Sequence, residues 1–175
     1  MKTVSVLFVC ASSAYWSMAG VDCYDVIRDA RSFPGGSPVV AHPPCALWGK
    51  LSHMAKRLES ERDLAHFALA QVRENGGVLE HPARSTFFTS QGIFPGVRDS
   101  FGGYVVPILQ FWFGHRADKA TWLYVCRVPL ISLPPLPLQI GYMSRSVEMM
   151  GKPERERTPV ELASWLVAAA RGVIA

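Results

Sequence analysis

The sequence predicts an α/β fold in which helices flank a mostly parallel β-sheet. Three observations carry this prediction. Short runs of β-branched and aromatic residues recur along the chain, and segments with a helical spacing of apolar residues separate them. The third is composition, because 175 residues that are 49% hydrophobic and 18% charged can bury one sizeable core. We therefore expect a single domain over residues 1–175 and exclude a disordered chain.

The first expected strand is the apolar run over residues 4–9. Lys2 ahead of this run and the small residues that follow it also resemble a secretory signal. The run is shorter and richer in β-branched residues than a signal core, so we favour a buried strand and a cytoplasmic protein. The four cysteines form no C-x-x-C pair, which is typical of a reducing compartment, and no apolar run reaches the roughly 18 residues of a membrane span.

The middle of the chain alternates strand and helix patterns. A short strand is expected over residues 38–42, and a helix over residues 64–72, where apolar residues recur on one helical face. Gly76 supplies a left-handed stop after that helix, and the next strand is expected at once, over residues 77–80. This order is typical of βαβ units.

The last third predicts one more strand and one more helix. Residues 120–126 have the composition of a buried strand, and the proline-rich residues 129–137 favour an extended connector. Thr158 as N-cap, Pro159 in the first turn and Glu161 three residues after Thr158 predict a capping box that starts a C-terminal helix.

The most informative stretch for function is VVAHPPCALWG, residues 39–49. A strand ends here in a rigid proline pair that delivers Cys45 to a turn or helix start. Backbone N–H groups and the helix dipole are expected to lower the pKa of such a thiol, and ligands of open α/β sheets bind at the carboxyl ends of strands. The alternative is a buried, inert cysteine.

A carboxylate stands at the end of the next expected strand. In GGVLEHP the apolar run leads directly into Glu80, which places this residue at the same edge of the sheet as Cys45. Partial burial is expected to raise the pKa of Glu80. The alternative roles are a helix cap or an ion pair with an arginine.

A third polar group precedes the strand over residues 120–126. Gln110, His115, Arg116 and Lys119 lie just ahead of it, and Arg116 is placed to bind a carbonyl oxygen or a phosphate. The alternative is a surface salt bridge.

These motifs together resemble a known family. Pro-Pro-Cys after a strand, a helix, Val-Leu-Glu-His-Pro, and a Gln-to-Arg run that leads into a strand resemble DNA cytosine-5 methyltransferases in order and approximate spacing. The whole chain is similar to short phage-encoded, methyltransferase-like proteins that combine AHPPC, an acidic residue before a proline at a strand end, and an FGH segment before KAT. The resemblance implies a Rossmann-like fold and action on DNA or a nucleotide, in the host cytoplasm if the chain is phage-encoded.

The resemblance also implies roles for individual residues. Cys45 resembles the nucleophile that adds to C6 of cytosine and makes C5 reactive toward a methyl donor. Glu80 resembles the acid that protonates or hydrogen-bonds N3, and Arg116 the arginine that contacts the base carbonyl. The neighbouring residues expected to contact the substrate are Pro44, His81 and His115.

The implied methyl donor is S-adenosylmethionine. Residues 8–12, with Phe8 and Ser12 at their ends, stand where the family has a glycine-rich turn, and Asp25 or Asp29 stands where it has an acidic residue; we expect Asp29. The chain has no room for a separate target-recognition domain. It is therefore expected to act on a nucleotide, on single strands, or with a partner subunit or second copy.

Two other interpretations remain. His42 and Cys45, together with Glu80, His81 and His115, have zinc-ligating side chains, but no second paired motif accompanies them, and we expect no metal. A non-catalytic protein with the same fold could bind nucleic acid or a host protein, and the net charge of +4 favours an anionic partner for either function. Such a binding protein should tolerate Cys45→Ser.

Overall fold

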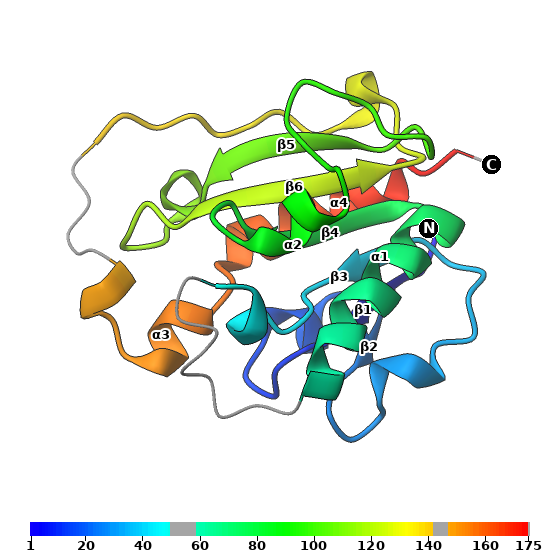
Figure 1. The fold of residues 1–175 in the computed structure, drawn as a ribbon, viewed down its shortest axis with the longest axis horizontal. Helices are drawn as coiled ribbons and strands as arrows, with labels where there is room; N and C mark the ends of the chain where they lie inside the picture. Colours follow the sequence, from blue (N-terminus) through cyan, green and yellow to red (C-terminus); the bar gives the residue numbers. More distant parts are fainter. Residues whose placement is uncertain (50–58, 142–146, 175) are drawn as a thin grey trace.

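Six strands form one mostly parallel sheet in the computed structural model, which describes residues 1–49, 59–141 and 147–174 (Figure 1). The strand order is β2-β1-β3-β4-β6-β5, in which β2, β1, β3 and β4 are parallel and β6 runs antiparallel to both of its neighbours. The strands are β1 (Val4–Leu7), β2 (Val21–Tyr24), β3 (Val39–Ala41), β4 (Gly77–Pro82), β5 (Tyr104–Leu109) and β6 (Ala120–Cys126). The expected α/β architecture is confirmed at this level.

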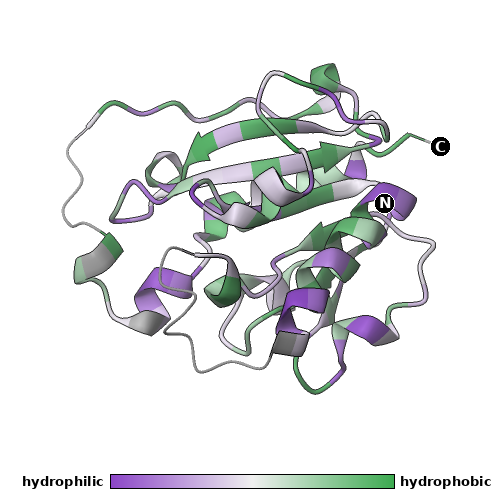
Figure 2. Cartoon of the chain, in the orientation of Figure 1, coloured by the Kyte–Doolittle hydropathy of each residue, from purple (hydrophilic) through white to green (hydrophobic). Residues whose placement is uncertain are grey.

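Two long helices cover opposite faces of the sheet. In Figure 1, α1 lies in front of the strands and α4 behind them. The alternation along the strands explains this, because Leu79 packs in the core cluster that contains α1, whereas Val78 packs in the cluster that contains α4. The α-helices are α1 (Arg62–Asn75), α2 (Thr86–Ser90), α3 (Lys152–Glu156) and α4 (Val160–Arg171). Figure 2 shows hydrophobic residues along the strands and hydrophilic ones on the outer side of α1.

Short 3-10 turns connect the main elements. Those used below are η1 (Ala14–Ser17), η2 (Ala30–Ser32), η3 (Ala46–Trp48) and η6 (Gln110–Phe113). Of the helices in the described residues, none combines the length and the apolar character needed to span a membrane.

The expected strands correspond to β1, β3, β4 and β6, whereas two strands were missed. β2 interrupts its apolar residues with Asp22, and β5 contains Pro107, which strands tolerate at an edge. Both missed strands are the edge strands of the sheet. Proline cannot donate to a strand ladder, so at the sequence level Pro107 argues against a strand although its neighbours are apolar.

The predicted capping box of the C-terminal helix is wrong. The helix begins at Val160, and Pro159 rather than Thr158 is its N-cap, with no capping hydrogen bond from a side chain. The ψ of Pro159 is 147°, which is extended rather than helical and keeps this residue outside the helix. The Pro159 carbonyl accepts the first helical bond, from Ala163.

The strand order has a topological switch point between β1 and β3. β1 lies between β2 and β3, so the strands that follow it in the chain are added to the sheet on opposite sides of β1. The β1-to-β2 connection runs through η1, which contacts α4, while the β3-to-β4 connection runs through α1 on the other face. Ligands of open α/β sheets bind outside the carboxyl ends of the strands at such a switch point.

Candidate functional site

Glu80 lies at the centre of a polar cluster at the carboxyl edge of the sheet. It belongs to β4 and shares the α4 face with Val78. His42, which directly follows β3, places Nδ1 3.1 Å from Glu80 Oε2. Gln110, at the start of η6, donates from Nε2 to Glu80 Oε1 at 3.0 Å. The Glu80 side chain is only 12% exposed, so these contacts replace most of its hydration.

The hydrogen bonds continue on both sides of Glu80. The Tyr15 hydroxyl in η1 lies 2.9 Å from His42 Nε2, and Gln110 Nε2 also donates to Thr121 Oγ1 at 3.1 Å. An ionised carboxylate only accepts, so the network assigns a proton to His42 Nδ1. In neutral His42, Nε2 then accepts the hydrogen of the Tyr15 hydroxyl. One chain of hydrogen bonds therefore joins η1, the end of β3, β4, η6 and β6.

The Glu80 carboxyl group is ionised at neutral pH, and the raised pKa expected from the sequence is wrong. Burial alone would raise the pKa of Glu80, but the hydrogen bond with His42 and the charge of Lys119 outweigh it and lower the pKa to about 2. At neutral pH this side chain accepts hydrogen bonds and donates none.

Cys45 lies at the N-terminus of η3, four residues after the end of β3, and is exposed to solvent. Cys45 is therefore not a buried cysteine. The predicted lowering of its pKa is also wrong: desolvation by surrounding protein atoms, then the Glu80 charge, raise the pKa of Cys45 against smaller opposing effects of Lys119 and its own backbone. η3 has three residues and supplies little helix dipole.

Lys119, and not Arg116, is the cation that acts electrostatically on Glu80 and Cys45. The Lys119 charge lowers the pKa of both Glu80 and Cys45. Arg116 donates to Glu154 Oε1 of α3 at 2.9 Å, and its side chain is 54% exposed. The expected contact between Arg116 and a base carbonyl stays a prediction. Both cations belong to the predicted polar run. The sequence alone did not show which of them acts on Glu80.

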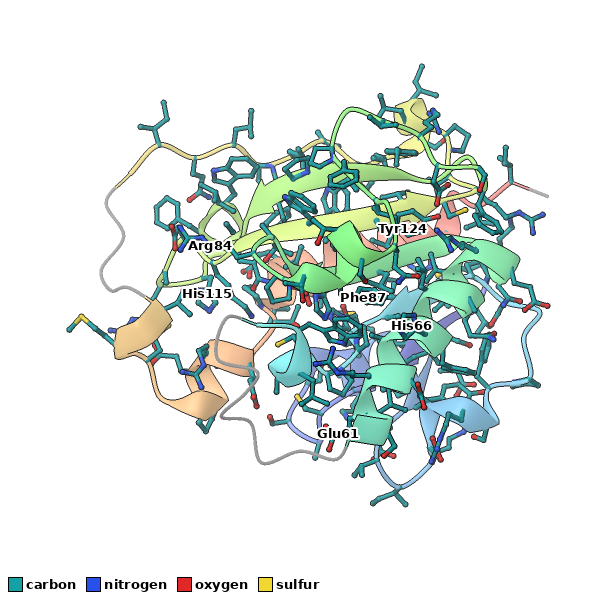
Figure 3. All side chains as sticks on the ribbon, viewed as in Figure 1. Glu61, His66, Arg84, Phe87, His115 and Tyr124 are labelled. Atoms are coloured by element: carbon teal, nitrogen blue, oxygen red, sulfur yellow. The ribbon has the colours of Figure 1, made fainter. Side chains whose placement is uncertain are left out.

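The two histidines expected to contact substrate, His81 and His115, are buried, and neither is hydrogen-bonded to Glu80. His81 points to the opposite face of β4, where its ring packs 5.4 Å from Phe87 and 5.8 Å from Phe88 between centroids. Burial lowers the pKa of His81 to about 4 despite the Glu80 charge, so its ring is neutral at pH 7. His115 accepts the Ala117 N–H at Nδ1, 3.1 Å away, which fixes the loop before β6. In Figure 3, His115 lies on the left side of the view, away from Phe87.

Pro44, the third residue expected to contact substrate, is half-buried beside Cys45. Its ring restricts the backbone that leads from His42 to the thiol. Of the site residues predicted from the sequence, the structure thus brings Cys45 and Glu80 to one edge. Tyr15 and Thr121 were missed, and no local sequence signal points to them.

The described residues after β1 do not fit S-adenosylmethionine. Phe8 itself adopts a left-handed φ of 66°, and the chain has no glycine in the following turn. The cavity beside this turn has a volume of about 100 Å³, well below the roughly 300–1,000 Å³ of small-molecule sites. Its lining residues are Cys10, Ser12, Ser13, Ala14, Arg157, Thr158 and Val160. Ser12 is present as expected, but in a space too small for the donor.

Asp29 does not contribute an acceptor to this cavity. Its carboxylate is held by Arg31, with Oδ2 2.7 Å from Nη2, and it also caps η2 by accepting the Arg31 N–H. The other acidic residue considered, Asp25, accepts the backbone N–H groups of Ile27 and Arg28. A larger cavity of about 480 Å³ lies at the opposite, amino end of the strands, beside Lys2, Pro38 and Arg127.

No group of three or more His, Cys, Asp or Glu side chains within the described ranges is arranged to hold a metal ion. The residues considered for zinc have other contacts: His42 bonds to Glu80 and Tyr15, and His81 packs on phenylalanine rings.

Comparisons with protein-family models, with curated proteins and with solved structures found no match to this chain. An exposed thiol, an acceptor-only carboxylate and an ammonium group at one sheet edge suit nucleophilic addition to a flat, polar ring that offers N–H donors.

Proposed function

We propose that the protein acts on cytosine, in DNA or in a nucleotide, through nucleophilic addition of Cys45 to the ring. The observation that carries the proposal is the pairing of Cys45 and Glu80 at the carboxyl ends of the adjacent strands β3 and β4, close enough for the Glu80 charge to act on the thiol. The order of motifs that resembles cytosine-5 methyltransferases supports cytosine as the target and a methyltransferase-like fold.

Water is the co-reactant of this step. The Cys45 thiol loses its proton to solvent, Sγ bonds to C6, and the C5=C6 π electrons move to C5, which takes a proton from water. Removal of the original C5 hydrogen reforms the double bond and expels the thiolate. The resemblance implies a methyl group as the electrophile at C5, but no step is routed through a methyl donor, because the described residues do not fit it.

Glu80 recognises the ring in this proposal. Its carboxylate accepts the exocyclic N4–H, and it accepts N3–H when the ring becomes protonated there as negative charge develops. A bound N–H donor also offsets the Glu80 charge, which is one of the causes that raise the pKa of Cys45. Substrate binding thereby favours the thiolate.

Deuterium exchange at C5 tests the proposal. Purified protein is incubated in deuterated buffer with deoxycytidine monophosphate or single-stranded DNA, and C5–D is measured by mass spectrometry. We expect exchange that rises between pH 7 and 9 and is lost in Cys45→Ala, while Cys10→Ala, which removes the other exposed cysteine, keeps it. Absence of exchange for both substrates, or exchange that survives in Cys45→Ala, overturns the proposal.

A second candidate is a non-catalytic protein of the same fold that binds nucleic acid or a host protein. The small cavity beside Ser12 and the raised pKa of Cys45 favour it. It predicts that single-stranded DNA or a host protein binds equally to the wild type and to Cys45→Ser, without exchange. For either function we propose a location in the cytoplasm, and for duplex DNA a partner subunit or second copy.

A further inference from the structure

We propose that His42, oriented by Tyr15, is a positioning residue that aims the Glu80 carboxylate at the substrate. The identity of the group that Glu80 binds rests on the proposed function. The contacts of His42 with Tyr15 and Glu80 are independent of that function. His42 does not reach the thiol by any contact that the described residues show; it acts through Glu80.

The backbone places His42 for this role. Its N–H donates to the Leu7 carbonyl of β1 at 3.1 Å, which extends the β1–β3 pairing by one residue. Ala41 pairs with Leu79 in the neighbouring strand, so the next residue of each strand, His42 and Glu80, project from the same face. Their side chains are 13% and 12% exposed, and the 3.1 Å contact between them is therefore shielded from water.

Tyr15 fixes which nitrogen of His42 faces Glu80 with a proton. Its hydroxyl lies 2.9 Å from Nε2, and the two rings are 5.5 Å apart between centroids. Burial, and then the Glu80 charge, raise the pKa of Tyr15, so the hydroxyl keeps its hydrogen. Donation from Tyr15 to Nε2 leaves Nδ1–H for Glu80.

The opposite oxygen of Glu80 is fixed by a neutral group. Gln110 Nε2 bonds to both Glu80 and Thr121, and the Thr121 hydroxyl donates to the Lys119 carbonyl. A flipped Gln110 amide would turn its oxygen toward the carboxylate, which is repulsive. Gln110 and His42 thus hold one Glu80 oxygen each, and an ionised carboxylate with about four acceptor positions keeps two for a ligand with paired N–H groups.

Several charges act on Glu80 from the surrounding elements. Lys119 before β6, His42 after β3 and His81 within β4 all lower its pKa. Of these, His42 is the group that is also hydrogen-bonded to the carboxylate. Its removal takes away this hydrogen bond while burial, Lys119 and His81 remain, so the Glu80 pKa must rise.

Three substitutions of His42 separate positioning from packing. Asn places its amide nitrogen near the position of Nδ1 and keeps the donor to Glu80, whereas Gln places it near Nε2 and keeps only the contact with Tyr15. We expect His42→Ala and His42→Gln to raise the Glu80 pKa by about one unit or more, and His42→Asn to stay closer to wild type. Tyr15→Phe is expected to give a smaller rise.

The measurement is NMR titration of side-chain-labelled Glu80, assigned with Glu80→Gln, on variants whose circular dichroism confirms folding. The acid limb of C5 exchange should move upward in pH with the Glu80 pKa. An unchanged Glu80 pKa in His42→Ala, or rescue by Gln rather than Asn, overturns the proposal. A shifted Glu80 pKa in a protein that never exchanges C5 upholds the positioning by His42 and refutes the proposed function instead.

Discussion

Two carboxylates of similar burial, Glu80 and Asp99, differ in how completely the protein satisfies them. Asp99 accepts four hydrogen bonds: Oδ2 from Arg73 at 2.9 Å and from the Tyr124 hydroxyl at 2.8 Å, and Oδ1 from the backbone N–H groups of Phe101 and Gly103. Glu80, by contrast, accepts two from the described residues. The side chains are 11% and 12% exposed.

The difference separates a structural carboxylate from one with spare capacity. All four acceptor positions of Asp99 are filled, and their donors pin the loop before β5 against α1 and β6. Glu80 is held firmly in direction but keeps acceptor positions at a sheet edge where ligands of α/β folds bind. Burial and a lowered pKa are common to both carboxylates, so the difference between them lies in the number of unfilled acceptor positions.

Loss of Asp99 should give the largest effect on stability. Asp99→Ala leaves the Arg73 guanidinium, which is 18% exposed, without its carboxylate and frees two backbone N–H groups. We expect a loss of about 3 kcal/mol in the free energy of unfolding, measured by urea denaturation. Glu80→Gln should cost less than Asp99→Ala, since it keeps one side-chain oxygen as an acceptor and frees no backbone N–H group. Equal losses in the two variants would contradict the distinction.

Acid unfolding should occur in two phases with different causes. His81 has a pKa lowered from 6.5 to about 4, so the unfolded chain binds its proton first, and this contribution is lost as pH falls from 6.5 to 4. Glu80 has a pKa lowered from 4.5 to about 2, so its contribution is lost between pH 4.5 and 2.

Each contribution is on the order of 2–3 kcal/mol. His81→Phe, which suits the neighbouring phenylalanine rings, should flatten stability between pH 6.5 and 4, and Glu80→Gln should flatten it below pH 4.5. Urea midpoints measured from pH 2 to 8 check both. A slope between pH 6.5 and 4 that persists in His81→Phe would show that another group causes it.

Removing the charge of Lys119 should weaken the site without unfolding the protein. Lys119→Met raises the pKa of both Cys45 and Glu80, because the ammonium group lowers both. We expect the rate of C5 exchange to fall by roughly tenfold at pH 7.5 and to recover as pH rises. Unaltered exchange would remove Lys119 from the account.

Arg116 should give the smallest effect. Its ion pair with Glu154 is exposed, and pairs of this kind contribute about 0–1 kcal/mol. Arg116→Ala is therefore expected to change the urea midpoint little and exchange by less than about threefold. A loss of a hundredfold or more would support the contact with a base carbonyl that the family resemblance implies.

The sequence predicts the elements whose signal is local. Continuous apolar runs identify β1 and β6, and the strand ends place Cys45 and Glu80 at one edge. The direction of the Glu80 pKa shift was missed because it depends on His42, 38 residues away in the chain. The position of His81 was missed because β4 extends to Pro82, two residues beyond the expected strand, so the alternation of the strand turns His81 away from Glu80 and toward Phe87.

C5 exchange in the wild type, Glu80→Gln and Asp99→Asn, measured where all three are folded, tests most directly whether Glu80 binds the ring. We expect Asp99→Asn to exchange at close to the wild-type rate per folded molecule and Glu80→Gln to fall by about a hundredfold. Equal rates in the wild type and Glu80→Gln, or an equal fall in both variants, would contradict this expectation.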